Sequence, residues 1–281
     1  MLVNLNDVLY DAQKNNYAIG LFNTTDTDML EAVISAAEEL RSPVIIGTAE
    51  VLLPYGSLQL IGPAIINMAK RATVPVVVHF DHGVTFENCM EALRLGFTSI
   101  MFDGSANEIS ENVKATAQIV KIAHAFGATV EGEIGHVGDA GNNNHATDDM
   151  YTTPEEAKNF VDATGVDALA IAIGTAHGVY KTKPKLDIER LKQIRNTIDT
   201  PLVLHGGSGL TDEDFKNTVK NGIAKVNIFT DLCVAGDIAI ANNLGDKSGF
   251  NEYLSLRAKK VEAMKKAAMD KMLLFGSNGR A

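Results

Sequence analysis

The sequence predicts one (β/α)8 barrel, a single α/β domain over residues 1–281 that ends in a C-terminal helical extension. Short apolar runs alternate with longer stretches of helical pattern, which is the order of a parallel sheet with helices packed on it. The runs are continuously apolar, as in strands that are buried on both faces. There are eight of them, and eight such units close into a barrel. An open, doubly wound sheet is the alternative.

Residues that end strands or begin helices bound each predicted element. Gly, Pro, Asn or Thr flank the predicted strands, which are residues 18–22, 44–47, 76–80, 99–102, 129–134, 168–173, 202–204 and 225–228. Several predicted helices open with a capping residue before acidic ones, and they span residues 27–40, 85–95, 109–126, 153–164, 188–198 and 212–221. Residues 251–275 predict a terminal helix, whose apolar stripe either closes the barrel bottom or faces a second subunit.

The composition argues against several classes of protein. The net charge of -10 disfavours a nucleic acid or an anionic membrane as a partner. No apolar run reaches the roughly 18 residues of a membrane-spanning helix. The first residues lack the basic and apolar segments of a signal peptide, and Cys89 and Cys233 have no CxxC spacing. We therefore expect a soluble cytoplasmic protein whose cysteines are packing residues.

Polar side chains occur at or near the C-terminal end of every predicted strand. Barrels of this class carry their active sites at that end. In chain order these residues are Asn23, Thr48, Asp81 with His82, Asp103, Glu133, His177, His205 and Asn227. Because parallel strands end at the same mouth, we expect these side chains to face one site.

Three of these residues are histidines, and their imidazoles can meet at one point if the strands are neighbours. Three histidine ligands with one open position form a known arrangement for catalytic zinc. The sequence therefore predicts a Zn2+ site at His82, His177 and His205, although each residue alone also fits a hydrogen-bonded structural histidine.

Three carboxylates accompany the histidines. Asp81 directly precedes His82 and can act as a general acid and base, or it can orient a ligand imidazole. Asp103 and Glu133 together can hold a second cation or an alternative zinc position, or each can make structural hydrogen bonds. The carboxylates thus predict either proton transfer or support of the metal.

Two segments, the first of them rich in glycine, indicate a phosphate site. The turn at residues 206–209 and the segment at residues 227–230 follow the seventh and eighth predicted strands, where barrels often bind phosphate through backbone N–H groups. The long segment at residues 135–151 holds glycines, asparagines and aspartates with little that could pack, and is either a mobile lid or an irregular surface loop.

Seven motifs together resemble one family, the zinc-dependent class II aldolases, in the branch that acts on fructose or tagatose 1,6-bisphosphate. The resemblance covers nearly the whole chain. The motifs are Phe-Asn at 22–23, His-Phe-Asp-His-Gly at 79–83, Met-Phe-Asp-Gly-Ser at 101–105, Val-Glu-Gly-Glu-Ile-Gly at 130–135, Ala-Ile-Ala-Ile-Gly-Thr-Ala-His-Gly at 170–178, Pro-Leu-Val-Leu-His-Gly-Gly-Ser-Gly at 201–209 and Lys-Val-Asn-Ile at 225–228.

The resemblance implies a homodimeric barrel that cleaves a phosphorylated ketose reversibly to dihydroxyacetone phosphate and an aldehyde. It implies one catalytic zinc on the three histidines, Asp81 as proton donor and acceptor, and a possible second metal at Asp103 and Glu133. The expected substrate and phosphate residues are Asn23, Gly178, Gly206, Gly207, Ser208, Asn227, Ile228, Phe229 and Thr230. The segment at 135–151 matches a loop that closes over substrate.

Three positions depart from the family pattern, and they bear on the substrate. Phe229 replaces a small or polar residue, Ala49 replaces a serine, and Asn251 replaces an arginine that helps bind the second phosphate. We therefore expect a preference for a 1-phosphorylated ketose that lacks the terminal phosphate or carries another terminal group. A metal-dependent sugar-phosphate isomerase or epimerase and a non-catalytic barrel subunit are the alternative functions.

Overall fold

The computed structural model describes residues 1–135, 138–139, 151–177, 184–244 and 250–281, without the side chains at 138–139, 176–177 and 250–251. Its main sheet is a closed ring of parallel strands. Around the ring these are β4 (Val76–Gly83), β3 (Val44–Ala49), β2 (Ile19–Asn23), β11 (Ile223–Ile228), β10 (Leu202–Leu204), β8 (Ala168–Ile171), β6 (Thr129–Ile134) and β5 (Ser99–Phe102). Because β5 also pairs with β4, the ring closes. The predicted (β/α)8 barrel is confirmed, and the open sheet is wrong.

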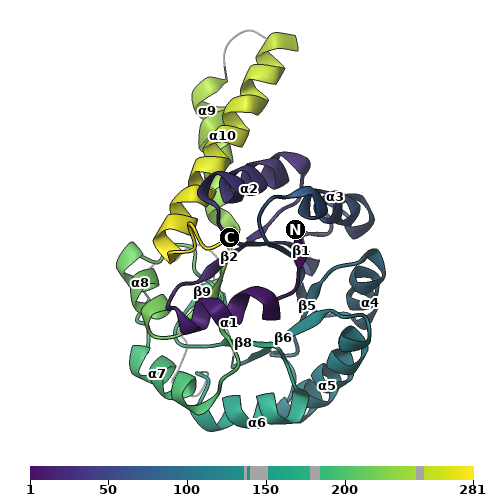
Figure 1. Cartoon of the computed structure of the whole chain (residues 1–281), viewed down its shortest axis with the longest axis vertical. Coiled ribbons are helices and arrows are strands. Elements are labelled where there is room, and N and C mark those ends of the chain that lie inside the picture. The colour runs from purple at the N-terminus through teal and green to yellow at the C-terminus, as the bar shows by residue number, and fades with distance from the viewer. Residues whose placement is uncertain (136–137, 140–150, 178–183, 245–249) are drawn as a thin grey trace.

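Helices surround the ring, as Figure 1 shows in a view along the barrel axis. They are α1 (Asn6–Lys14), α2 (Thr27–Leu40), α3 (Leu58–Arg71), α4 (Phe86–Leu95), α5 (Ile109–Ala125), α6 (Pro154–Thr164), α7 (Ile188–Thr197), α8 (Asp212–Lys220), α9 (Thr230–Asn243) and α10 (Phe250–Phe275). Four short elements complete the described chain: β1 (Leu2–Val3) beside β4, the paired strands β7 (Gly138–Asp139) and β9 (Ala176–His177), and the 3-10 helix η1 (Glu50–Leu52). Among the described residues, no helix has the length and apolar character needed to cross a bilayer.

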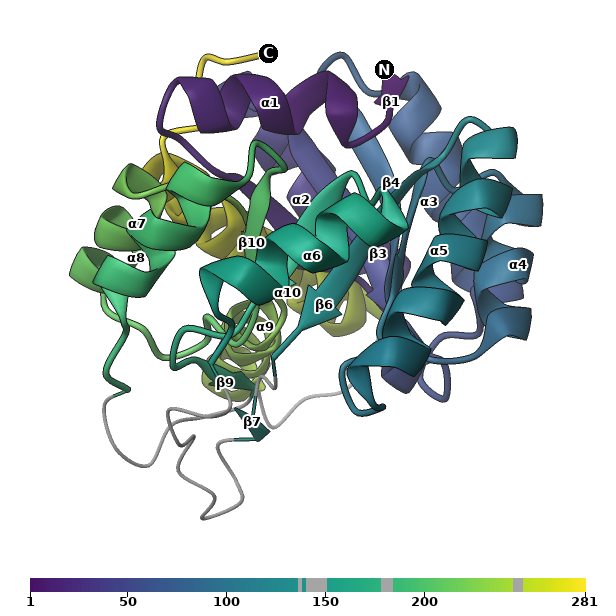
Figure 2. The ribbon, with the colours of Figure 1, turned by 90° about the horizontal axis from the view of Figure 1, so that it is seen from below.

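The bottom of the barrel is closed by α1 and not by the terminal helix. Val8, Leu9 and Ala12 of α1 form an apolar cluster with side chains from the strands, among them Leu21 and Val77. Figure 2 shows α1 and both termini at this end of the barrel, and β7 and β9 at the opposite end. The terminal helix α10 instead packs against α2 and α9, and it projects with α9 beyond the ring in Figure 1.

Several element boundaries differ from the prediction. β4 runs on to Gly83, so Asp81 and His82 lie within a strand and not after it. β8 ends at Ile171, earlier than predicted, and β11 begins at Ile223. The helices α1, α3 and α9 lie outside the predicted helical stretches; in α3 the pair Gly62-Pro63 interrupts the sequence pattern.

The interior of the barrel changes from apolar to polar along its axis. Above the apolar cluster at the bottom, the fully buried side chains of His79, Ser99, Glu131 and Lys225 form a polar layer. Residues two positions apart in a strand share a face. Asp81, Glu133 and Asn227 therefore follow this layer on the inward face, one step nearer the mouth where the strands end.

Candidate active site

A cavity of about 780 Å3 opens at the mouth formed by the C-terminal ends of the strands. Its wall includes Asp81, His82, Asp103 and Glu133, together with side chains from β2, η1 and the segments after β10 and β11. The structure thus brings residues from distant parts of the sequence into one site, as the positions of the polar residues predict. Thr48 is buried but does not line this cavity.

Asp81 is held by two side-chain amides. Asn23 donates a hydrogen bond of 2.7 Å to Oδ2, and Asn227 donates to Oδ1 and Oδ2 over 3.0 and 3.1 Å. Burial alone would raise the pKa of Asp81, but the nearby charges of His82 and Lys225 outweigh burial and hold this pKa well below its ordinary value. The group is therefore a fixed carboxylate, which is the form that can accept a proton.

An unusual backbone conformation brings Asp81 and His82 into the same cavity. Consecutive side chains of a regular strand point to opposite faces. His82 has a φ of 44°, in the left-handed region that non-glycine residues rarely occupy. The pairing of β4 with β5 shifts register between Phe80 and Gly83, and both Asp81 and His82 line the cavity. The strained backbone therefore lets two adjacent residues serve one site.

The rings of His82 and His205 face each other, and a carboxylate anchors each of them. Asp103 Oδ2 lies 2.8 Å from His82 Nδ1, and Glu131 Oε1 lies 2.8 Å from His205 Nε2. The other ring nitrogens, His82 Nε2 and His205 Nδ1, are 2.9 Å apart. Carboxylate partners of this kind fix the tautomer and orientation of metal-binding histidines.

The donor atoms around these two rings fit a zinc ion. Ligands at a Zn–N distance of about 2.0–2.1 Å in a tetrahedral site are roughly 3.3 Å apart, so two ring nitrogens that face each other need only a small separation to share the ion. Glu133 Oε2 lies 3.5 Å from His205 Nδ1 and has no hydrogen-bond partner among the described residues. Two donor groups that could hold a metal meet here: Asp81 with His82 and His205, and His82 with Asp103 and Glu133.

The electrostatics of the metal-free site leave one imidazole charged and one carboxyl neutral. Burial lowers the pKa of His82, but the negative charge of Asp81 and the hydrogen bond that His82 donates to Asp103 outweigh burial and raise it to about 10. Burial and the negative charge of Asp103 raise the pKa of Glu133 to about 8. A cation bound between these groups would replace the proton on His82 and favour the ionised form of Glu133.

The third predicted zinc ligand is placed only by its backbone. His177 lies in β9 and pairs with Asp139 of β7, while its side chain is not described. Gly178 and most of the segment at 135–151 lie outside the described residues, and the side chain of Asn251 does as well. The predictions for these residues remain untested.

The predicted phosphate residues line the same cavity as Asp81 and His82. They are Gly206, Gly207, Ser208, Asn227, Ile228, Phe229 and Thr230. Gly206 has a φ of 67°, and a Cβ at Gly207 would lie 3.1 Å from the ring of Phe215. The turn therefore requires glycine at the first position and has little space for a side chain at the second.

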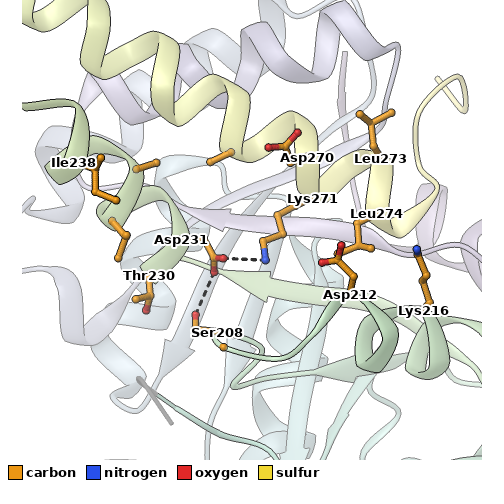
Figure 3. A pocket seen from close by; sticks show the side chains of 14 residues that line it. Ser208, Asp212, Lys216, Thr230, Asp231, Ile238, Asp270, Lys271, Leu273 and Leu274 are labelled. Carbon is orange, nitrogen blue, oxygen red and sulfur yellow. Dashed lines mark hydrogen bonds and ion pairs between the residues drawn. The ribbon is translucent and has the colours of Figure 1, made fainter. Parts of the chain in front are cut away.

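A second cavity, of about 900 Å3, lies behind this turn, between α8, α9 and α10. Figure 3 shows that Asp231 joins Lys271 of α10 to Ser208 of the turn. The ion pair from Lys271 Nζ to Asp231 Oδ1 is 2.8 Å long, and Ser208 Oγ lies 3.5 Å from Asp231 Oδ2. Helix α10 thus braces the glycine-rich turn from outside the barrel.

A family match agrees with this geometry. The family model described as "Fructose-bisphosphate aldolase class-II" matches residues 3–280. The chain belongs to this family. It is therefore a class II aldolase, a lyase, and the match favours this function over an isomerase, an epimerase or a non-catalytic subunit.

Relatives of this class II aldolase match it over its full length. It is 41% identical over 281 residues to "Uncharacterized protein YdjI" of Escherichia coli (strain K12), with 99% of each chain covered. It is 39% identical over 308 residues to a fructose-bisphosphate aldolase of Thermus caldophilus, with 100% of each covered. The crystal structure of the YdjI aldolase from Escherichia coli K12 superposes with a TM-score of 0.91 at 39% identity and covers 100% of both chains.

Sequence reasoning missed three residues beneath the site of this aldolase. Glu131 and Lys225 form a buried ion pair of 2.7 Å, and His79 Nε2 lies 3.7 Å from Asp81 Oδ1. All three lie inside strands, whereas the prediction selects polar residues at strand ends. Each is two positions before a predicted site residue or within its motif, so the two-residue period of a strand could have placed them on the inward face.

Replacing Glu133 by Gln should change how the stability of the metal-free aldolase depends on pH. A carboxyl whose pKa is raised from 4.5 to about 8 by folding contributes stability below pH 4.5 and loses it as the pH rises to about 8, because the unfolded chain ionises freely. Between about pH 5 and pH 8 the wild-type Tm should fall by at least about 2–4 °C more than that of Glu133→Gln. This shift corresponds to roughly 1 kcal/mol in the free energy of unfolding.

Thermal unfolding in the presence of a chelator measures this difference, with the exposed substitution Glu213→Gln as the control. Parallel pH profiles for the wild type and Glu133→Gln would show that Glu133 is already ionised in the metal-free site.

Proposed function

We propose that this protein is a zinc-dependent aldolase that cleaves a 1-phosphorylated ketose reversibly to dihydroxyacetone phosphate and an aldehyde. The observation that carries the proposal is the single cavity in which Asp81 and His82 lie beside the glycine-rich turn at residues 206–208. A base, a metal-binding group and a phosphate-binding turn are the three parts that this reaction needs, and the chain belongs to a family of aldolases.

In this proposal His82, His177 and His205 hold the zinc. The anchored rings of His82 and His205 support the assignment, as does Glu133 Oε2, which has no hydrogen-bond partner in the described part of the chain. A zinc ion supplies Lewis-acid polarisation of the ketone as charge develops on its oxygen. In the metal-free protein Asp103 anchors His82, which supports an orienting role for Asp103; its role and that of Glu133 as a second metal position remain a proposal.

Asp81 carries the proton transfer. During cleavage its carboxylate takes the proton from the C4 hydroxyl while the C3–C4 bond breaks and its electrons move toward the C2 carbonyl. During condensation Asp81 returns the proton to the new hydroxyl oxygen. The side-chain amides of Asn23 and Asn227 hold the carboxylate of Asp81 in place for this transfer, because both donate hydrogen bonds to it.

The glycine-rich turn binds the phosphate at C1. The backbone at residues 206–208 and the start of α9 at Thr230 face the cavity, and exposed N–H groups at such positions bind anions. By family resemblance we also propose a homodimer in the cytoplasm. The exposed apolar residues Val234 and Ile238 on α9 support an interface with a second copy.

The far end of the cavity favours a substrate without a second phosphate. Among the described residues that line the cavity, none is a lysine or an arginine, and Glu50, Val51, Leu52 and Val84 are part of its wall. A phosphate dianion is normally bound by a bidentate arginine, and Asn251 stands where the family has one. We therefore propose a 1-phosphorylated ketose with an uncharged or different terminal group.

A screen of phosphorylated ketoses tests the function and its substrate together. Cleavage is read by coupled detection of dihydroxyacetone phosphate, and kcat/KM for fructose and tagatose 1,6-bisphosphate is compared with that for fructose 1-phosphate and shorter 1-phosphoketoses. We expect the 1-phosphates to be preferred about tenfold or more, because a charge-assisted hydrogen bond is worth roughly 1.5–3 kcal/mol. A hundredfold preference for the bisphosphates would show that another cation binds the second phosphate.

Replacing Asp81 by Asn should separate proton transfer from metal binding. The substitution keeps the volume and removes the base, so cleavage should fall by about two to four orders of magnitude while zinc content stays near that of the wild type. Zinc is measured by elemental analysis of the purified protein, and His205→Ala is the comparison, because it should lose both zinc and activity. Loss of zinc from Asp81→Asn would instead make Asp81 a residue that supports the metal site.

A further inference from the structure

A buried ion pair inside the barrel contacts two residues of the site. Lys225 Nζ lies 2.7 Å from Glu131 Oε2, and both side chains are fully buried. The same Nζ donates a hydrogen bond of 2.7 Å to Asn227 Oδ1, and the other carboxylate oxygen, Glu131 Oε1, lies 2.8 Å from His205 Nε2. Neither Lys225 nor Glu131 lines the cavity. The pair can therefore affect the reaction through its contacts with Asn227 and His205, and through the charge of Lys225, which helps to lower the pKa of Asp81.

The hydrogen bond from Lys225 determines which way the side-chain amide of Asn227 points. An amide has an acceptor at one end and a donor at the other, whereas a lysine ammonium can only donate. Lys225 therefore holds Oδ1 of Asn227 on its own side and leaves Nδ2 facing Asp81. With the amide reversed, an oxygen would face the carboxylate of Asp81 and the two hydrogen bonds of 3.0 and 3.1 Å would be lost.

Packing alone does not account for a lysine at this place. Two charges removed from water are costly to bury, and apolar residues of similar volume often replace such pairs without loss of stability. The two residues that flank Lys225 in β11, Ala224 and Val226, are apolar and fully buried. The ammonium of Lys225 places a hydrogen-bond donor at a defined position, and Oδ1 of Asn227 accepts this hydrogen bond.

We propose that Lys225 is a positioning residue that orients Asn227 and, through it, the carboxylate of Asp81. Glu131 is the counterion that permits the lysine charge at this depth, and it also anchors His205. The inference rests on the proposed function, because it concerns the proton transfer assigned to Asp81. It predicts that removal of Lys225 lowers kcat while substrate binding at the glycine-rich turn is unchanged.

The double substitution Lys225→Met with Glu131→Gln tests this role. Lys225→Met alone leaves a buried carboxylate without its counterion and is expected to destabilise the fold. The double variant removes both charges of the pair at similar volume, and the oxygen of the new glutamine can still accept the hydrogen bond from His205. Its Tm should therefore recover to near that of the wild type, while Asn227 still lacks its donor.

Three measurements on the double variant and the wild type separate positioning from stability. We expect kcat for the preferred ketose to fall about 10- to 100-fold, the usual effect of losing a residue that orients a site. We expect KM to stay within about threefold; the zinc affinity is measured by competition with a chelator, and kcat is taken at saturating zinc, because Glu131→Gln also alters the contact that anchors His205. The control is Ser42→Ala, which removes a buried hydrogen bond of 2.7 Å to Ser277 away from the cavity and should lower Tm without changing kcat.

Two results would overturn the positioning role. A double variant with wild-type Tm and wild-type kcat would show that the pair only balances charge. A loss of kcat that follows Tm in the same way in Ser42→Ala would show a general effect of stability. Absence of cleavage by the wild type on every ketose would instead refute the proposed function and the positioning role with it, so the two failures are distinguishable.

Discussion

Carboxylate anchors on two imidazoles are the interactions on which the rest of the site depends. Asp103 fixes His82 and Glu131 fixes His205, each over 2.8 Å, and the remaining nitrogens of the two rings face one point. Without an anchor a ring can turn or move its proton to the other nitrogen. The closed barrel makes this arrangement possible, because it brings the ends of β4, β5, β6 and β10 to a single mouth.

The backbone at His82 is strained at the mouth of the barrel, as backbone at functional sites often is. A left-handed conformation costs a non-glycine residue roughly 1–2 kcal/mol. The conformation persists because both side chains at the kink are held: Asp81 by the amides of Asn23 and Asn227, and His82 by Asp103. As a result, two neighbouring residues place a carboxylate and an imidazole in the wall of the same cavity.

The sequence predicted the barrel and the polar side chains at its mouth for a physical reason. Strands buried on both faces are continuously apolar, so polar residues at their ends are conspicuous, as Asp81 and His205 are. The polar layer below the mouth was not predicted, because Glu131 and Lys225 lie within apolar strands. Their burial is explained only by the ion pair that they form across the barrel. The closure of the barrel bottom by α1 also depends on tertiary packing. It could not be predicted from the sequence of this short helix alone.

The dependence of cleavage on bound zinc tests the central claim most directly. The enzyme is stripped with a chelator, dialysed and titrated with zinc while metal content and the cleavage rate of the preferred ketose are measured together. If His82 and His205 hold the catalytic ion, the stripped enzyme should be inactive, and activity should return in proportion to zinc until about one ion per chain is bound. Full activity in the stripped enzyme would contradict the account.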